Sequence, residues 1–209
     1  MSDDRADRGV NIVVSDRLQQ QIAFILEIDK LKQIFRQTYL LDATRKENDA
    51  EHSWHLAMMA ILLPEWANEP DIDVLHVVKM VLIHDLVEID AGDTYAFDEK
   101  RYEDKAMREE KAAERLFHLL PHDQAKEIYD LWREFEDGAT PEAQFANSLD
   151  RVQPLMHNYY TDGKSWREHR VTSDKVWERI RPAKEGSETL YEFAESIIRG
   201  AIAKGYFVP

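Results

Sequence analysis

The residues of this chain that could do chemistry include a His-Asp pair, His84-Asp85, with an acidic residue, Glu88, one helical turn later. The surrounding segment 74–87 is largely apolar, and a helix of that kind normally lies in the core. Two carboxylates and an imidazole are costly to bury unless something compensates their polarity. A divalent cation would compensate, because it attracts carboxylates and accepts a lone pair from neutral imidazole. This segment alone leaves two interpretations open, a metal site and a buried hydrogen-bonded pair.

Two other places in the chain could supply further ligands. His52 stands at the start of a predicted helix whose next turns are apolar, and Asp150 lies beside an apolar stripe. Taken singly, each has a simpler interpretation, His52 as an exposed histidine and Asp150 as an ion-pair partner of Arg151 or Arg45. A second His-Asp pair, His122-Asp123, falls at another predicted helix start, where an aspartate is simply a favourable first-turn charge.

The composition restricts both the ligands and the partners. The 209 residues include no cysteine, and 27 basic against 41 acidic residues give a net charge of −14. Any metal must therefore be held by His, Asp, Glu or backbone oxygens. The acidic surface should repel a phosphate backbone, which argues against a nucleic-acid polymer as partner. The charged N-terminus does not resemble a signal peptide and the apolar stretches are short or interrupted, so we expect a cytoplasmic protein without a membrane partner.

Helices must position these residues, because no alternation of apolar and polar residues indicates a convincing strand. With 44% hydrophobic residues the chain can bury one core, and we predict an all-α fold, a single compact multi-helix domain. A continuous helix through the His-Asp pair would place His84, Asp85 and Glu88 on one arc. The expected helices cover, in order, about 17–36, 51–66, 74–89, 99–119, 121–137, 141–160, 173–180 and 187–203.

The order of His52, His84-Asp85 and Asp150 resembles the H…HD…D signature of the HD-domain phosphohydrolases. Local sequence is similar as well, since residues 45–52 resemble an R-x-E-x-x-x-E/D-H motif and residues 84–93 resemble H-D-x-x-E-x-x-x-G-D. Both motifs are typical of the branch that contains bacterial 5'-deoxynucleotidases and the eukaryotic HD-domain-containing protein 2 group. The resemblance covers about residues 16–160 and is specific enough to outweigh the simpler interpretations.

The resemblance implies a role for each candidate residue. Glu88 matches the catalytic glutamate, which orients or deprotonates the attacking water, with a carboxylate supporting a ligand histidine as the alternative. Asp93 matches an aspartate that contacts the deoxyribose 3'-hydroxyl or assists proton transfer, with a helix cap as the alternative. One divalent transition metal, with Mn, Co, Fe, Zn and Ni all compatible, would be held by four residues. These implied ligands are His52, His84, Asp85 and Asp150.

Two arginines could match the one that grips the phosphate in the family. Arg36 is the first choice because a guanidinium suits bidentate contact with phosphate oxygens, and Arg45 could take part of that role. His55 lies three residues after His52, but the histidine-rich pattern of two-metal HD phosphodiesterases is missing, so we expect a single metal.

The function that the resemblance implies is a 5'-deoxynucleotidase, which hydrolyses deoxyribonucleoside 5'-monophosphates to deoxynucleoside and phosphate. The alternatives are an HD-fold phosphohydrolase of another small nucleotide or phosphate ester, and a non-catalytic metal- or nucleotide-binding helical module. The partner is then a small-molecule nucleotide substrate, and relatives suggest a homodimer. We expect an N-terminal tail over 1–15, an HD-domain core over 16–163 and a helical extension over 164–209 packed on the core.

Overall fold

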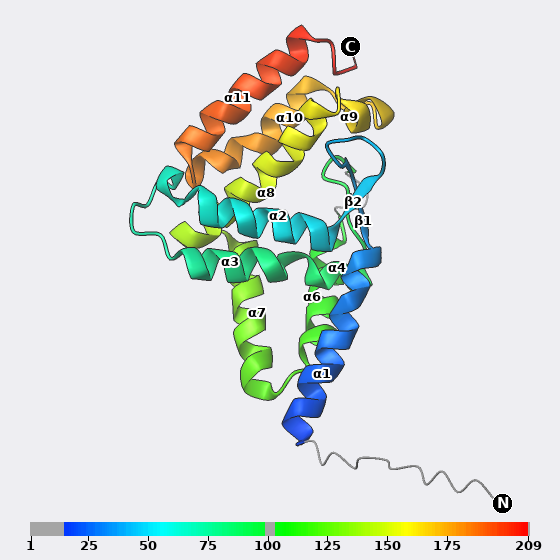
Figure 1. The fold of residues 1–209 in the computed structure, drawn as a ribbon, viewed down its shortest axis with the longest axis vertical. Helices are drawn as coiled ribbons and strands as arrows, with labels where there is room; N and C mark the ends of the chain where they lie inside the picture. The colour runs from blue at the N-terminus through cyan, green and yellow to red at the C-terminus, as the bar shows by residue number, and fades with distance from the viewer. Residues whose placement is uncertain (1–14, 99–102, 209) are drawn as a thin grey trace, which may run out of the picture.

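Helices dominate the structure, a computed structural model that describes residues 15–98 and 103–208, and the all-α prediction is confirmed (Figure 1). The α-helices are α1 (Asp16–Ile28), α2 (Asp49–Leu62), α3 (Val74–Ile83), α4 (Glu88–Ala91), α6 (Lys105–Phe117), α7 (His122–Asp137), α8 (Pro141–Tyr160), α9 (Lys164–Glu168), α10 (Ser173–Ile180) and α11 (Glu188–Ala203). Short 3₁₀ turns and two strands join them: η1 (Asp29–Gln33), β1 (Phe35–Tyr39), β2 (Lys46–Asn48), η2 (Pro64–Trp66), η3 (His84–Val87) and η4 (Arg181–Glu185).

Local sequence explains where the two site-bearing long helices begin. At the start of α2 the Asn48 side chain accepts from the Glu51 N–H, and the Glu51 side chain accepts from the Asn48 N–H, a complete capping box. At the start of α8 the Thr140 side chain accepts from the Ala143 N–H, and Pro141 occupies the first turn, where its missing N–H costs nothing. These caps fix the ends of the helices that carry His52 and Asp150.

The prediction of one helix over 17–36 is wrong for the second half of that range. The helix α1 ends at Ile28, η1 follows, and the chain then forms β1, which pairs antiparallel with β2. Phe35 pairs with Asn48 and Tyr39 pairs with Lys46. The hairpin is short and half-exposed, so its sequence lacks the alternation that identifies a strand, and pairing across the hairpin decides its conformation. Arg36 therefore projects from a strand rather than from a helix.

The helix expected over 74–89 is also interrupted. The helix α3 ends at Ile83, the turn η3 carries the His-Asp pair, and α4 starts at Glu88. A 3₁₀ turn is tighter than an α-helix and changes the angle between successive side chains. The expectation that His84, Asp85 and Glu88 share one arc of a continuous α-helix therefore does not hold. Gly92, with φ 73°, ends α4 in a conformation that glycine adopts without strain. The start of the helix expected over 99–119 lies partly outside the described residues.

The helices α2, α3 and α8 form the centre of the molecule. The helix α3 packs against α2, α7 and α8, and Leu56, Met80 and Leu149 from the three central helices are fully buried. Figure 1 shows α10 and α11 on one side of this centre and α6 and α7 on the other. None of the helices in the described ranges combines the length and apolar character needed to span a bilayer.

The segment after α8 packs closely on the rest of the fold. The helix α11 and the turn η4 contact α8, and the Ser148 hydroxyl donates to the Ala183 carbonyl at 2.7 Å. A Cβ at Gly186 would lie 2.1 Å from the Gln144 carbonyl oxygen, so the turn approaches α8 as closely as a glycine allows. The division of the chain into a tail, a core to residue 163 and an extension stays a prediction.

Candidate metal centre

Three elements far apart in sequence bring the expected metal ligands together. His52 comes from α2, His84 and Asp85 from η3, and Asp150 from α8. Nε2 of His52 lies 3.0 Å from Oδ1 of Asp150, and Nε2 of His84 lies 3.1 Å from Oδ1 of Asp85. The two imidazole ring centres are 5.6 Å apart, and all four side chains are buried. The arrangement is therefore a compact nitrogen-and-oxygen cluster inside the fold.

Hydrogen bonds on the outer ring nitrogens determine which way the two imidazoles present their lone pairs. Nδ1 of His52 lies 3.1 Å from Oε1 of Gln153, and Nδ1 of His84 lies 2.9 Å from the Val81 carbonyl oxygen. Both oxygens only accept, so each Nδ1 donates a proton to its partner and each Nε2 faces the cluster, where it has a lone pair when the ring is neutral. Nε2 of His84 forms no hydrogen bond within the described part of the chain. A metal-ligating histidine is oriented in the same way.

The centre sets the two imidazole Nε2 atoms against carboxylate oxygens, an arrangement that requires positive charge between them. Burial lowers the pKa of His84, but the charges of Asp85 and Asp150 outweigh burial and raise that pKa to about 9. Burial lowers the pKa of His52 to about 4. Against the opposing effect of burial, the imidazoles hold the pKa of Asp85 and of Asp150 below the usual range. Either a proton on His84 or a divalent cation supplies the charge, and the donor set fits a transition metal.

A second group of carboxylates adjoins the first through Asp85. Ligand oxygens of Asp49, Asp85 and Glu88 lie within 4.8 Å of one another, and all three side chains are buried. Burial, followed by the charge of Asp85, raises the pKa of Asp49 to about 8 and raises the pKa of Glu88 well above its usual range. Oε2 of Glu88 has no hydrogen-bond partner among the described residues. Glu88 is therefore placed to accept a proton beside the cluster.

The strand β1 places Arg36 directly over these carboxylates. Its Nη1 lies 2.7 Å from Oδ2 of Asp85 and 3.5 Å from Oδ1 of Asp49, and only 14% of the side chain is exposed. Arg45 instead forms an exposed ion pair with Glu51 and does not line the cavity described below. Of the two candidate arginines, only Arg36 has the position to meet an anion beside the cluster.

Three of the four side chains in this cluster, His84, Asp85 and Asp150, line a cavity of about 350 Å³, and His52 lies behind them. Asp93 lines it, just after the Gly92 turn, and Nη2 of Arg179 from α10 lies 3.5 Å from Oδ2 of Asp150. Basic and aromatic side chains of several elements complete the wall, namely Arg36, Lys105, Arg151, Arg179, Tyr95, Phe97, Phe135 and Trp166. A cavity of this size and mixed lining suits a small anionic molecule.

Three residues of the site were not expected from the sequence. Asp49 occupies a motif position that allows any residue, so its type carried no signal. Gln153 follows Asp150 by three residues on α8, and helical spacing could have identified it as a neighbour of that ligand. Arg179 comes from the segment outside the motif resemblance, where nothing in the sequence pointed to the site.

Comparison with known proteins supports the interpretation of the motif. A family model described as HD domain matches residues 28–191. Human 5'-deoxynucleotidase HDDC2 is 30% identical over 136 residues, which is 65% of this chain and 65% of the human protein. The bovine protein of the same name is 31% identical over 136 residues, 65% of this chain and 64% of that protein. The chain thus spans about 65% of the length of these curated relatives.

A solved structure resembles nearly the whole chain. It is the crystal structure of a predicted metal-dependent phosphohydrolase from Magnetospirillum magnetotacticum, 51% identical, with a TM-score of 0.88 over 92% of this chain and 96% of that one. The match extends well past residue 163, so the helices after α8 are shared with that structure. Since the HD domain match covers most of the sequence, this chain belongs to the HD domain family.

Proposed function

We propose that this protein is a metal-dependent phosphomonoesterase that acts on deoxyribonucleoside 5'-monophosphates. The observation that carries the proposal is the convergence of two imidazole Nε2 atoms and two carboxylates beside the buried guanidinium of Arg36, with His84, Asp85, Asp150 and Arg36 in the wall of one cavity. The curated relatives are named as 5'-deoxynucleotidases, and the Magnetospirillum protein is named as a predicted metal-dependent phosphohydrolase. Together these support a hydrolase of a small phosphate monoester.

The ligands we propose for a single divalent ion are His52, His84, Asp85 and Asp150. A divalent ion held there would polarise a phosphoryl oxygen and lower the pKa of water. Mn, Co, Fe, Zn and Ni all accept this donor set, which contains no thiolate.

The remaining roles belong to side chains around that centre. Glu88, buried and one residue beyond η3, would take the proton of the attacking water. Arg36 would exchange its contact with Asp85 for the phosphate oxygens, to which a guanidinium binds in a bidentate manner. Asp93 would accept a hydrogen bond from a sugar hydroxyl, because it lines the same cavity at the end of α4.

Phosphate release tests this proposal directly. The protein loaded with Mn²⁺ or Co²⁺ should release phosphate from deoxyribonucleoside monophosphates faster than from ribonucleoside monophosphates. Arg36→Lys should raise KM, because an ammonium cannot make the bidentate contact, while Arg45→Lys should leave KM unchanged. A folded, metal-loaded protein that releases no phosphate from either set of nucleotides would contradict the proposal and favour another phosphate ester or a non-catalytic module.

We also propose that the protein is a cytoplasmic homodimer. Large apolar side chains remain exposed on α1, α2 and α3, among them Leu26, Trp54, Leu62 and Leu75. A second copy packed on these helices would remove such side chains from water. Light scattering coupled to size exclusion should give twice the mass of one chain, and Leu26→Glu should shift the mass toward the monomer. Cell fractionation tests the location.

A further inference from the structure

Four lysine and arginine side chains of the described chain line the cavity beside the candidate metal centre, and three of them have close partners. Arg36, Lys105 and Arg151 each lie 2.7 to 2.8 Å from a carboxylate or amide oxygen. The fourth, Arg179 on α10, has one polar side-chain contact among the described residues, in which its Nη2 lies 3.5 Å from Oδ2 of Asp150. That distance is long for a hydrogen bond, and a guanidinium has five N–H donors. Of the four, Arg179 therefore has the most hydrogen-bonding capacity left for a ligand.

The charge of the cavity wall gives that capacity a use. Six carboxylate side chains line the cavity, against the four lysine and arginine side chains. A phosphate that enters is repelled by these carboxylates unless positive charge lies close to it. A metal ion at the candidate centre would supply part of that charge, and a guanidinium without a close partner can supply more.

The helix α10 directs Arg179 toward the cavity. Val176, Arg179 and Ile180 all line the cavity, and their spacing of three and four residues places them on one face of the helix. Val176 and Ile180 are buried, whereas 33% of the Arg179 side chain is exposed. The helix packs against α8 and α11 (Figure 1). The two apolar side chains thus anchor this face and hold the guanidinium between them beside Asp150.

Two guanidinium groups approach the Asp150 carboxylate from separate elements. Nη2 of Arg36 on β1 lies 3.9 Å from Oδ1 of Asp150, and Nη2 of Arg179 on α10 lies 3.5 Å from Oδ2. Asp150 is one of the metal ligands we propose, so a phosphate bound at that centre would lie close to both guanidinium groups. Phosphate has enough oxygens for two such groups to contact it at once.

We propose that Arg179 is a second phosphate-binding residue, which contacts the phosphate oxygens of the substrate together with Arg36. This role rests on the proposed phosphomonoesterase function and belongs to the same cavity. Arg179 would exchange its long contact with Asp150 for charge-assisted hydrogen bonds to phosphate, which are shorter and stronger. The segment after residue 163, where nothing in the sequence pointed to the site, then supplies part of the substrate-binding surface.

Binding of inorganic phosphate tests the proposal without turnover. Calorimetry on the Co²⁺-loaded protein, freed of unbound metal, should show that Arg179→Gln binds phosphate roughly 10- to 100-fold more weakly than the wild type, as expected for the loss of hydrogen bonds to a charged group. Arg181→Gln removes the same charge from an exposed position outside the cavity wall, and it should bind phosphate like the wild type. Equal affinities in Arg179→Gln and the wild type, or a wild type that binds no phosphate, would overturn the proposal.

Metal content and kinetics separate this role from a structural one. Arg179→Gln should keep the metal content of the wild type, and its KM for a deoxyribonucleoside monophosphate should rise while kcat changes much less. Loss of metal in Arg179→Gln would overturn the proposal and assign Arg179 the positioning of Asp150 instead.

The role of Arg179 and the proposed activity can be refuted separately. A wild type that hydrolyses deoxyribonucleoside monophosphates, with normal phosphate binding in Arg179→Gln, refutes only the role of Arg179. A wild type that hydrolyses none of them, yet binds phosphate more tightly than Arg179→Gln does, refutes only the deoxynucleotidase activity.

Discussion

The dipeptide His-Asp occurs twice in this chain, and its two copies differ in nearly every physical respect. His84-Asp85 is buried on a 3₁₀ turn, and both of its side chains approach groups from other elements. His122-Asp123 is exposed at the start of α7, where Asp123 forms an ion pair with Arg17 at 2.8 Å. Burial decides the difference, because buried polar groups need defined partners whereas exposed ones have water. The same dipeptide therefore contributes to a candidate metal centre at one position and to a surface ion pair at the other.

The same substitution in the two copies should have the most different effects on activity. Asp85→Asn should abolish phosphate release, with a loss greater than the roughly 100-fold that removal of a partner supporting a metal ligand produces. Asp123→Asn should leave activity unchanged. Steady-state kinetics and metal content of both variants measure the effect. Equal activities in the two variants would show that burial does not distinguish the two copies functionally.

Glu88 lies just after the buried His84-Asp85 pair, and its substitution should give the next largest loss of activity. Glu88→Gln preserves the shape of the side chain but removes the group that takes a proton, so kcat should fall by about 100-fold or more. Metal content should stay at the wild-type value, because Glu88 is not among the ligands we propose. Loss of the metal together with activity would instead assign Glu88 a role in holding the ion.

The titration of His84 should appear in the pH dependence of metal binding. Its pKa of about 9 lies above the ordinary value of 6.5, so below pH 9 a metal ion must displace a proton from the ring. Affinity should therefore rise with pH, up to about tenfold per unit, and level off above pH 9. Calorimetry in buffers of different ionisation enthalpy should detect the released proton. His122→Gln is the matched control, and an affinity independent of pH between 6.5 and 9 would contradict the assignment.

The exposed copy should give the smallest effect. Arg17→Ala removes both contacts to Asp123, at 2.8 and 2.9 Å, but these groups are exposed and screened by salt. The melting temperature should shift slightly at low salt and not measurably at high salt. A large shift that persists at high salt would show that the contact contributes to packing and would weaken the contrast with the buried copy.

Local sequence signals predicted much of the helical framework. The caps at Asp73, Thr140 and Ser187 and the left-handed Gly138 place helix ends within a few residues of the predicted positions. Predictions failed where long-range contacts decide the conformation, as in the β-hairpin at Arg36 and the 3₁₀ turn at His84. Propensity describes how a residue behaves alone, whereas these segments depend on what packs against them.

The kinds of ligand and their order along the chain could be predicted without the structure. The lack of cysteine restricts any metal to nitrogen and oxygen donors, and the ordered motif predicted His52, His84, Asp85 and Asp150 as one group. Which arginine faces that group became clear from the fold, because Arg36 contacts Asp85 and Arg45 pairs with Glu51 instead.

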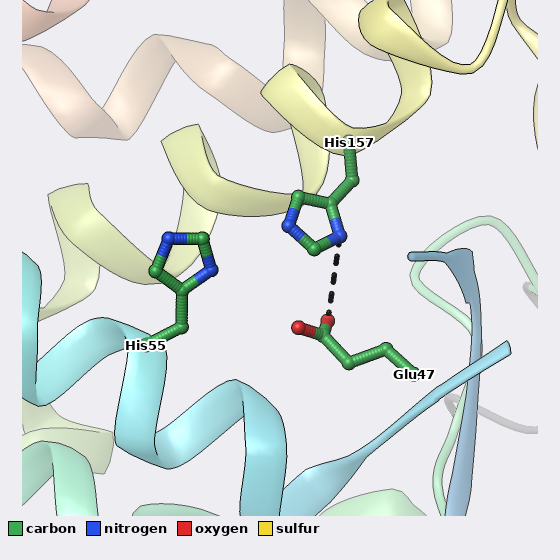
Figure 2. Close-up of side chains that lie close together, drawn as sticks. All are labelled: Glu47, His55 and His157. Atoms are coloured by element: carbon green, nitrogen blue, oxygen red, sulfur yellow. Dashed lines mark ion pairs between the residues drawn. The ribbon is translucent and has the colours of Figure 1, made fainter. Parts of the chain in front are cut away.

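The structure also places Asp49 and Gln153 beside the four proposed metal ligands. Behind them, Glu47, His55 and His157 form a second cluster (Figure 2). The physical reason is that the directions of side chains from separate elements depend on how those elements pack. Spacing along the chain encodes packing only within a single helix or strand.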